Sequence, residues 1–160
     1  MPGGILIEYD RGLRKAVETT SNFLNDLFDI TLYEATLQTH NIQIRADLLN
    51  KIKNDIHVVE VKSSTGIKEI YLVDSAIQYS VMAGAGFAPA KISLAHINNK
   101  FVYLGDSNYN DLFKVVDLTS EVSERAEQVP EWIEAANKTI AGDLPRTEVG
   151  EHCTKPYSCP

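Results

Sequence analysis

Apolar residues in the first part of the chain recur at helical spacing and then give way to strand-like alternation. Residues 11–28 carry an apolar stripe with charged residues mostly off it, which predicts a helix. Residues 31–39 and 43–52 read as two strands joined at "THN", and residues 56–62 read as a third strand after the turn "KND". Three strands with such short links are expected to form an antiparallel meander.

The middle of the chain predicts a β-α-β unit. Residues 74–85 read as a helix that ends in "GAG", and residues 91–97 read as a strand. The strands 56–62 and 91–97 should then run parallel to each other. "NNK" at residues 98–100 predicts a hairpin turn into a further strand at residues 101–104.

The C-terminal part predicts one more helix, with Pro130 in its first turn and Gly142 at its end. Residues 117–128 are predicted to be a solvated linker or a helix. The order α-β-β-β-α-β-β-α indicates an α/β fold with a mixed central sheet flanked by helices. No glycine-rich phosphate loop follows a strand, so a Rossmann or P-loop fold has no support. We expect one domain over residues 1–145 and a cysteine-containing tail over residues 146–160.

The strand at residues 43–52 carries a polar face. Alternation places Ala46 and Leu48 on one side and Arg45 and Asp47 on the other. If the third strand is its neighbour, the side chain of Asp47 approaches the polar face of that strand. Asp47 is therefore the first candidate for chemistry.

Glu60 and Lys62 share one face of the third strand, and Glu60 lies 13 positions after Asp47. Two converging carboxylates are hard to keep ionised without a cation. Mg²⁺ or Mn²⁺ would resolve this, since Mg²⁺ takes oxygen ligands from one or two carboxylates, carbonyl groups and water. Asp47, Glu60 and the backbone carbonyl of Val61 are thus candidate metal ligands. Lys62 would orient or activate a water, or stabilise phosphoryl charge.

The same residues allow a plainer interpretation. A Glu-x-Lys pair in a strand is typical of an exposed cross-strand charge pair. Gln78 lies between Asp74 and Met82 on one helical face, where it would either look back at the strand end or remain on the surface. The residues alone leave both interpretations open.

As a set, the motifs resemble the PD-(D/E)XK nuclease superfamily. They are "RADLL" at 45–49, "EVKSST" at 60–65, "AIQ" at 76–78, "HIN" at 96–98 and "HCTKPYSC" at 152–159. Within the superfamily they are most similar to the RecB/Cas4-type nucleases and to the uncharacterised family DUF2779. The likeness covers about residues 30–160. It implies a restriction-endonuclease-like αβββαβ core with a C-terminal helix and tail added.

The resemblance also implies roles for single residues. Asp47 and Glu60 would be the metal ligands and Lys62 the catalytic lysine. Gln78 and Tyr79 would support the site or touch the substrate. Mg²⁺ or Mn²⁺ is the implied cofactor, and DNA, single strands included, is the implied partner.

Further family features are incomplete in this chain. Some members use a residue of the first helix, for which Glu18 is the nearest candidate. RecB/Cas4-type relatives hold an iron–sulfur cluster with four cysteines, whereas this chain has two, Cys153 and Cys159. They are candidate remnant cluster ligands, with a cluster expected only in a longer parent protein of which this chain would be a fragment. The alternative is two free thiols in a loose tail. Where the family often has His-x-Asp, this chain reads "YLV" at residues 71–73.

Charge and composition narrow the function classes. The chain has 15 Lys and Arg against 22 Asp and Glu, a net charge of −7, which argues against a general nucleic-acid coat but not against a local metal site. No apolar run approaches the ~18 residues of a membrane helix, and no signal peptide is visible. Two cysteines do not make a disulfide scaffold. We therefore expect a cytoplasmic protein without a membrane partner.

Two functions remain open. The first is a metal-dependent nuclease domain that hydrolyses DNA phosphodiester bonds with a metal-activated water. The alternative is a catalytically inactive nuclease-fold domain that serves as a binding or assembly module for other domains or subunits of a larger protein. The acidic charge, the "YLV" sequence and the missing cysteines favour the alternative, whereas the intact Asp47, Glu60, Lys62 and Gln78 favour the nuclease.

Overall fold

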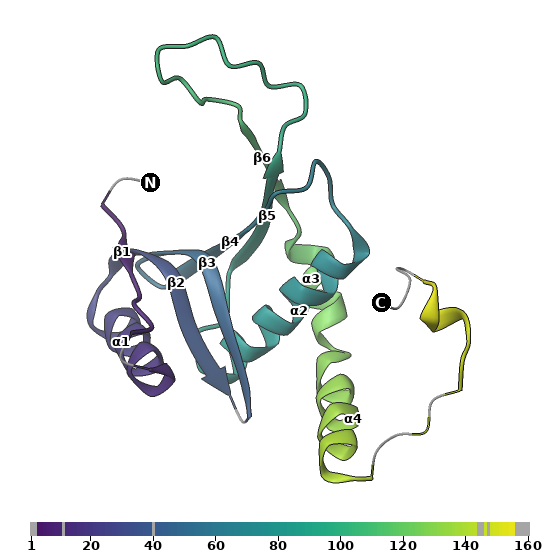
Figure 1. Ribbon diagram of the computed structural model, residues 1–160. Coiled ribbons are helices and arrows are strands. Elements are labelled where there is room, and N and C mark those ends of the chain that lie inside the picture. The colour runs from purple at the N-terminus through teal and green to yellow at the C-terminus, as the bar shows by residue number, and fades with distance from the viewer. Residues whose placement is uncertain (1–2, 11, 40, 144–145, 147, 156–160) are drawn as a thin grey trace. The chain divides into compact units, whose positions relative to one another are not determined.

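A computed structural model describes most of the chain, namely residues 3–10, 12–39, 41–143, 146 and 148–155 (Figure 1). Its elements, in chain order, are β1 Ile5–Leu6, α1 Leu13–Asp26, β2 Asp29–Thr39, β3 Ile42–Ile52, β4 Asp55–Lys62, α2 Glu69–Gly84, β5 Lys91–Ile97, β6 Phe113–Asp117, α3 Thr119–Ala126, α4 Val129–Ala141 and the 3₁₀ helix η1 Glu151–Cys153. The chain divides into two compact units, residues 1–129 and 130–160. The domain boundary expected after residue 145 stays a prediction.

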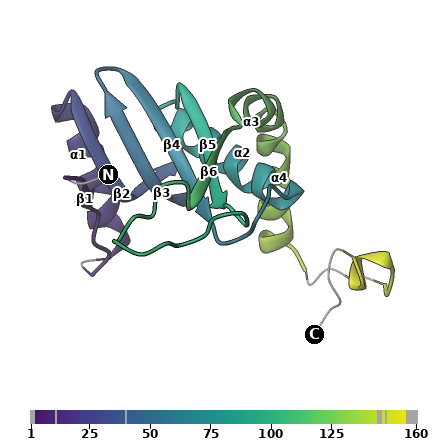
Figure 2. The same ribbon diagram turned by 90° about the horizontal axis from the view of Figure 1, so that it is seen from above.

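The first unit is built on a six-stranded mixed sheet in which the strands lie side by side in chain order (Figure 2). Strands β2, β3 and β4 pair antiparallel. Strands β4 and β5, which α2 connects, pair parallel, and β6 pairs antiparallel with β5. The predicted meander and β-α-β unit are confirmed. The order from α1 to β5 is the αβββαβ order of the restriction-endonuclease-like core, and the predicted α/β class is correct.

Helix α1 packs against β2 through a narrow buried stripe of Ala16, Thr20 and Leu24. The Thr20 hydroxyl accepts a hydrogen bond from the Thr36 amide at 3.0 Å and so satisfies a backbone donor of β2. At the other end of the helix, the ammonium of Lys51 donates to the carbonyls of Leu24 and Leu27. A lysine at this place satisfies carbonyls that the helix leaves unpaired and complements its dipole.

Helix α2 packs against β2, β3 and α3, and it buries Ser75, Ala76, Gln78, Val81 and Met82. The helix begins at Glu69, five residues before the predicted start, because the prediction relied on the face that begins at Asp74 and missed the first turns. This earlier start places Tyr71 on the helix beside the end of β4.

The predicted strand at residues 101–104 is wrong. Residues 98–112 form a long loop that extends away from the sheet (Figure 1). The strand that follows β5 and pairs antiparallel with it is β6. The prediction relied on the apolar residues Val102 and Leu104, which are typical of strands. In the structure their side chains are 71% and 92% exposed. The Asn98 side chain closes the loop by donating to the carbonyl of Asp111 at 2.9 Å.

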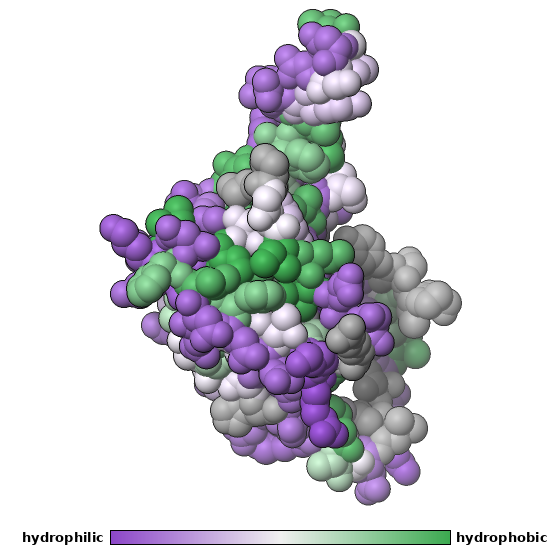
Figure 3. All heavy atoms as spheres, turned by 90° about the vertical axis from the view of Figure 1, so that its left-hand side faces the viewer, coloured by the Kyte–Doolittle hydropathy of each residue, from purple (hydrophilic) through white to green (hydrophobic). Residues whose placement is uncertain are grey.

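Strand β1, which the sequence pattern did not predict, has only two residues and pairs parallel with β2. Ile5 and Leu6 remain substantially exposed there, as do Leu27 and Ile52 nearby. Figure 3 views this side of the molecule and shows a green band of apolar side chains between polar surfaces. The short strand therefore leaves an apolar edge next to α1.

The second unit contains nearly all of α4 and the short helix η1. Helix α4 begins at Val129, with Pro130 in its first turn, and it ends one residue before Gly142, as predicted. Part of the stretch predicted as linker or helix is α3. No helix in the described ranges is long and apolar enough to cross a membrane.

Candidate functional site

The candidate site lies at an interruption of the sheet. Tyr33 pairs with Leu48 and Ala35 pairs with Ala46, but the pair between them, Glu34 and Asp47, is missing from the β2–β3 ladder. Glu34 has a φ angle of 58°, in the left-handed region that costs a non-glycine residue free energy. The β3–β4 ladder ends one pair before Asp47 would meet Glu60. Asp47 therefore sits where its strand loses regular pairing on both sides.

Burial along β3 does not follow a simple alternation around this interruption. Ala46 is fully buried, the next buried residue is Leu49, and Leu48 is only half-buried. The register with β2 is the same on both sides of the missing pair. The predicted placement of Ala46 and Leu48 on one face stays a prediction.

The Asp47 carboxylate bonds to the backbone of β4. Its Oδ2 accepts a hydrogen bond from the Val61 amide at 2.7 Å, and so it replaces the carbonyl that a continued ladder would offer. Burial raises the pKa of Asp47, the Val61 hydrogen bond lowers it, and the Glu34 carboxylate raises it further; the net direction is upward. Asp47 is thus fixed beside the segment that carries Glu60 and Lys62.

Glu60 is buried, with 7% of its surface exposed, and each of its carboxylate oxygens has a partner. Lys62 donates to Oε1 at 2.6 Å and Gln78 donates to Oε2 at 2.9 Å. Burial raises the pKa of Glu60, the Gln78 and Lys62 hydrogen bonds oppose this, and the Asp47 charge adds to the rise. The charge of Asp47 therefore disfavours the ionisation of Glu60, as expected for neighbouring acids.

Lys62 is held between two carboxylates, because it also donates to Asp74 at 2.8 Å. Burial alone would lower the pKa of Lys62, but the hydrogen bonds to Asp74 and Glu60 outweigh it and raise that pKa well above its usual range. The ammonium also lies 5.5 Å from the ring centroid of Tyr71. Lys62 therefore stays protonated at any physiological pH.

The structure links four of the predicted residues. Lys62 and Gln78 donate to the Glu60 carboxylate, and Asp47 accepts from the amide of Val61, the residue between Glu60 and Lys62. Tyr79 is half-buried on α2, and within the described residues neither carboxylate bonds to its side chain. Glu18 is exposed on α1 and pairs with Lys15 at 3.2 Å, so it does not join the cluster.

The cysteine predictions are not tested here. Cys153 is a free, half-buried thiol in η1. Cys159 lies outside the described residues.

Sequence reasoning missed Glu34 and Asp74 as members of the cluster. Asp74 was visible on the helical face of Gln78, but its ion pair with Lys62 depends on where α2 starts. Glu34 ion-pairs with Arg45 at 3.2 Å, and no motif in the sequence marks its left-handed backbone.

The chemistry of the donors fits one divalent cation. Burial raises the pKa values of Asp47 and Glu60. The charges of Glu34 and Asp74 add to the rise at Asp47, and the charge of Asp47 adds to it at Glu60, so a bound cation would relieve the repulsion at both acids. Within the described residues, no three His, Cys, Asp or Glu side chains form a group ready to hold a metal. The remaining ligands would therefore be the Val61 carbonyl and water, a mixture that Mg²⁺ accepts.

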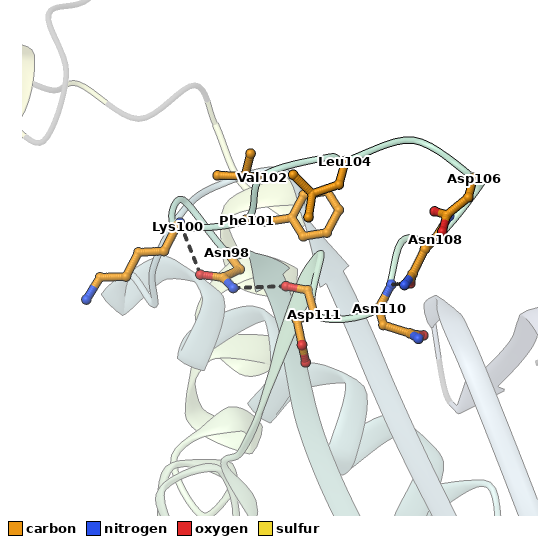
Figure 4. A pocket seen from close by; sticks show the side chains of 9 residues that line it. All are labelled: Asn98, Lys100, Phe101, Val102, Leu104, Asp106, Asn108, Asn110 and Asp111. Atoms are coloured by element: carbon orange, nitrogen blue, oxygen red, sulfur yellow. Dashed lines mark hydrogen bonds between the residues drawn. The ribbon is translucent and has the colours of Figure 1, made fainter.

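A cavity of about 420 Å³ lies away from these residues, in the loop between β5 and β6 (Figure 4). It is lined by Asn98, Lys100, Phe101, Val102, Leu104, Asp106, Asn108, Asn110 and Asp111. Short side-chain-to-backbone hydrogen bonds shape the loop, such as that from the Lys100 amide to Asn98 at 3.1 Å. The cavity is thus a feature of the loop and shares no residue with the Asp47–Glu60 site.

Comparisons with known proteins give only distant likenesses. No protein-family model and no curated protein matches the sequence. The crystal structure of SSO0001 is similar over 82% of this chain and 68% of that one, with 16% identity and a TM-score of 0.30. An alkaline exonuclease (LHK-Exo) from Laribacter hongkongensis is similar over 81% of this chain and 71% of that one, with 12% identity and a TM-score of 0.31. Scores this low establish no family, and the likeness to RecB/Cas4-type nucleases and DUF2779 stays a prediction.

Proposed function

We propose that the first unit is a metal-dependent nuclease domain that hydrolyses phosphodiester bonds of DNA. The observation that carries the proposal is the convergence of Asp47, Glu60 and Lys62 where the β3–β4 ladder ends. Two carboxylates and a lysine contributed by β3 and β4 are groups that metal-assisted phosphodiester hydrolysis can use. The motif resemblance supports the same reading.

The proposed cofactor is Mg²⁺ or Mn²⁺, held by Asp47 and Glu60 with the Val61 carbonyl. When bound, such a cation lowers the pKa of a coordinated water and neutralises charge on phosphoryl oxygens. The chain's own residues then divide the remaining work. Gln78 fixes the orientation of Glu60 through its 2.9 Å hydrogen bond, and the Val61 amide fixes that of Asp47.

Lys62 acts in this proposal as a fixed positive charge. Because Asp74 and Glu60 raise its pKa, it is a poor proton acceptor at neutral pH, which argues against a role as general base. A protonated lysine stabilises negative charge on the phosphoryl oxygens or orients the attacking water. Asp74 is the positioning residue that keeps the ammonium in place.

The alternative, a catalytically inactive module with the same fold, has a specific observation in its favour. Both oxygens of Glu60 already have partners, and Lys62 bridges Glu60 to Asp74 in one hydrogen-bonded network. Such a network can serve stability alone. The two functions differ in one respect that can be measured, which is cleavage.

The test is cleavage of labelled single- and double-stranded DNA with Mn²⁺, Mg²⁺ or EDTA. The parent chain should cleave only with a divalent cation, and Asp47→Ala and Lys62→Ala should both abolish cleavage. Tyr103→Ala, in the loop between β5 and β6, is the matched control and should cleave like the parent. Activity that survives both site substitutions would assign the chemistry elsewhere, and a lack of cleavage under every condition would favour the inactive module.

A further inference from the structure

His96 is a buried histidine on β5, the strand next to β4 in the sheet (Figure 2). The parallel register pairs His96 with Lys62, and it pairs Leu94 with Glu60. Paired residues of neighbouring strands project to the same face of a sheet, and their backbones lie about 5 Å apart. The imidazole of His96 therefore lies beside the lysine of the candidate site, on the face of the sheet that carries Glu60 and Lys62.

One hydrogen bond determines which nitrogen of His96 carries the proton. Nδ1 lies 3.0 Å from the carbonyl oxygen of Ile97. Because a carbonyl oxygen can only accept, Nδ1 is the donor, and the neutral ring then has its lone pair on Nε2. Among the described residues, this is the only hydrogen bond of the His96 side chain. Nε2 is thus an unused proton acceptor next to Lys62.

The other side chains of the site are already engaged and do not suit the removal of a proton from water. Lys62 holds its own proton, because Asp74 and Glu60 raise its pKa. Asp74 is bound to Lys62, and Asp47 and Glu60 are the proposed metal ligands. Histidine is the residue that most often acts as a general base. His96 therefore supplies a function that the other groups lack.

The charged neighbours of His96 on the adjacent strands are both lysines. Lys62 is its partner on β4, and Lys114, which is exposed, is its partner on β6. Helix α3 also packs against β5, but its first turn bonds the amide of Ile92, toward the other end of the strand. The charged residues of α3 are Glu121, Glu124 and Arg125. No carboxylate occupies a position paired with His96, so none on β4 or β6 lies directly beside it to hold the imidazole in an ion pair.

We propose that His96 is the general base of the proposed hydrolysis. The inference rests on the proposed function for the reaction and adds the group that takes the proton. As the oxygen of the attacking water forms its bond to phosphorus, one proton of that water passes to Nε2 of His96. The bond between phosphorus and the leaving sugar oxygen breaks, and that oxygen keeps the electron pair and takes a proton from solvent. The imidazolium then returns its proton to solvent.

The first test is the pH dependence of cleavage of labelled DNA with Mg²⁺. His96→Asn keeps an amide donor for the Ile97 carbonyl but has no nitrogen that can take a proton, so its rate at pH 7 should fall by at least about 100-fold. The rate of the parent should rise with pH and level off as a histidine loses its proton, and this rise should be absent in the variant. His57→Gln is the matched control and should cleave like the parent, because His57 lies on the opposite face of β4 and bonds Ser93. Melting curves confirm that both variants are folded.

The second test is chemical rescue, which a purely structural role for His96 would not produce. Added imidazole should raise the cleavage rate of His96→Ala by about 10-fold or more and leave Lys62→Ala unchanged, because only the first variant lacks a base. If the parent cleaves and His96→Asn retains its rate and pH profile, or imidazole fails to rescue His96→Ala, the inference is wrong and the proposed function stands. If the folded parent does not cleave DNA at all, both are wrong.

Discussion

The carboxylate of Asp47 accepts the amide hydrogen of Val61 at 2.7 Å, at the point where β3 and β4 stop pairing. One acid of the candidate site is thereby tied to the backbone of the segment that carries the other acid and the lysine. The positions of Asp47, Glu60 and Lys62 are therefore coupled. A change that moves β4 at Val61 moves all three groups.

Asp47→Asn should raise the stability of the protein at neutral pH. Asparagine can still accept the Val61 hydrogen bond, but it carries no charge to be desolvated. Folding raises the pKa of Asp47 above its ordinary value of 3.8. Between these two pKa values the folded parent binds more protons than the unfolded parent. Its stability therefore falls as pH rises through that window. The gain in the variant should appear above that window and vanish below it.

Urea denaturation of the parent and of Asp47→Asn measures the difference in their free energies of unfolding. The titrations are run between pH 3.5 and pH 8 in steps of about one pH unit. A variant that is equally stable or less stable at pH 7 would show that the buried charge of Asp47 is already compensated.

Gln78→Leu should destabilise the protein by about 1–3 kcal/mol, because it leaves Oε2 of the buried Glu60 without its donor. The free energy of unfolding, from urea titration, is the measurement. Gln128→Ala replaces an exposed glutamine at the end of α3 and serves as the control. Equal stability of Gln78→Leu and the parent would mean that water replaces the lost donor.

Glu34→Gly should be more stable than Glu34→Ala by about 1 kcal/mol, since glycine adopts the left-handed backbone without the cost that alanine has. Both variants lack the Arg45 ion pair, so their difference isolates the backbone. Thr31 lies on the same strand and has no left-handed backbone. There the order should reverse, with Thr31→Ala more stable than Thr31→Gly. The same order at both positions would show that the φ of Glu34 is not what strains this strand.

The order of strands β2 to β5 and the shared face of Glu60 and Lys62 could be predicted because they follow from local rules. Short links determine which strands are neighbours, and strand alternation determines that Glu60 and Lys62 share a face. The helical spacing left Gln78 either facing the strand end or on the surface. None of these steps needs knowledge of tertiary structure.

The distorted pair at Glu34 and Asp47 could not be predicted in this way. No residue there is a glycine or proline, and the left-handed φ of Glu34 is one that a non-glycine residue rarely adopts. Likewise, Val102 and Leu104 have the composition of a strand but lie exposed in a loop. Periodicity reports which residues would suit a strand, not where the chain finds a partner.

Asp117→Asn should reduce stability at neutral pH but not in acid. The side-chain and backbone hydrogen bonds from Thr119 lower the pKa of Asp117 to about 2, and Lys91 adds to this at 3.2 Å. A carboxylate with a lowered pKa contributes stability that is present above its unfolded pKa, near 3.9, and is lost as pH falls toward 2. Thermal melts of parent and variant should therefore differ at pH 6 and converge as pH falls through this window. A constant difference would assign the effect to packing.

The measurement that tests the central claim most directly is the single-turnover rate of DNA cleavage with Mn²⁺ for the parent, Asp47→Asn and Lys62→Ala. Asp47→Asn keeps the fold and the Val61 hydrogen bond, so a loss of rate there reports chemistry rather than unfolding. The account predicts a metal-dependent rate for the parent and a fall of at least about 100-fold in each variant. Equal rates in the parent and Asp47→Asn, or no cleavage by the folded parent at any metal concentration, would contradict it.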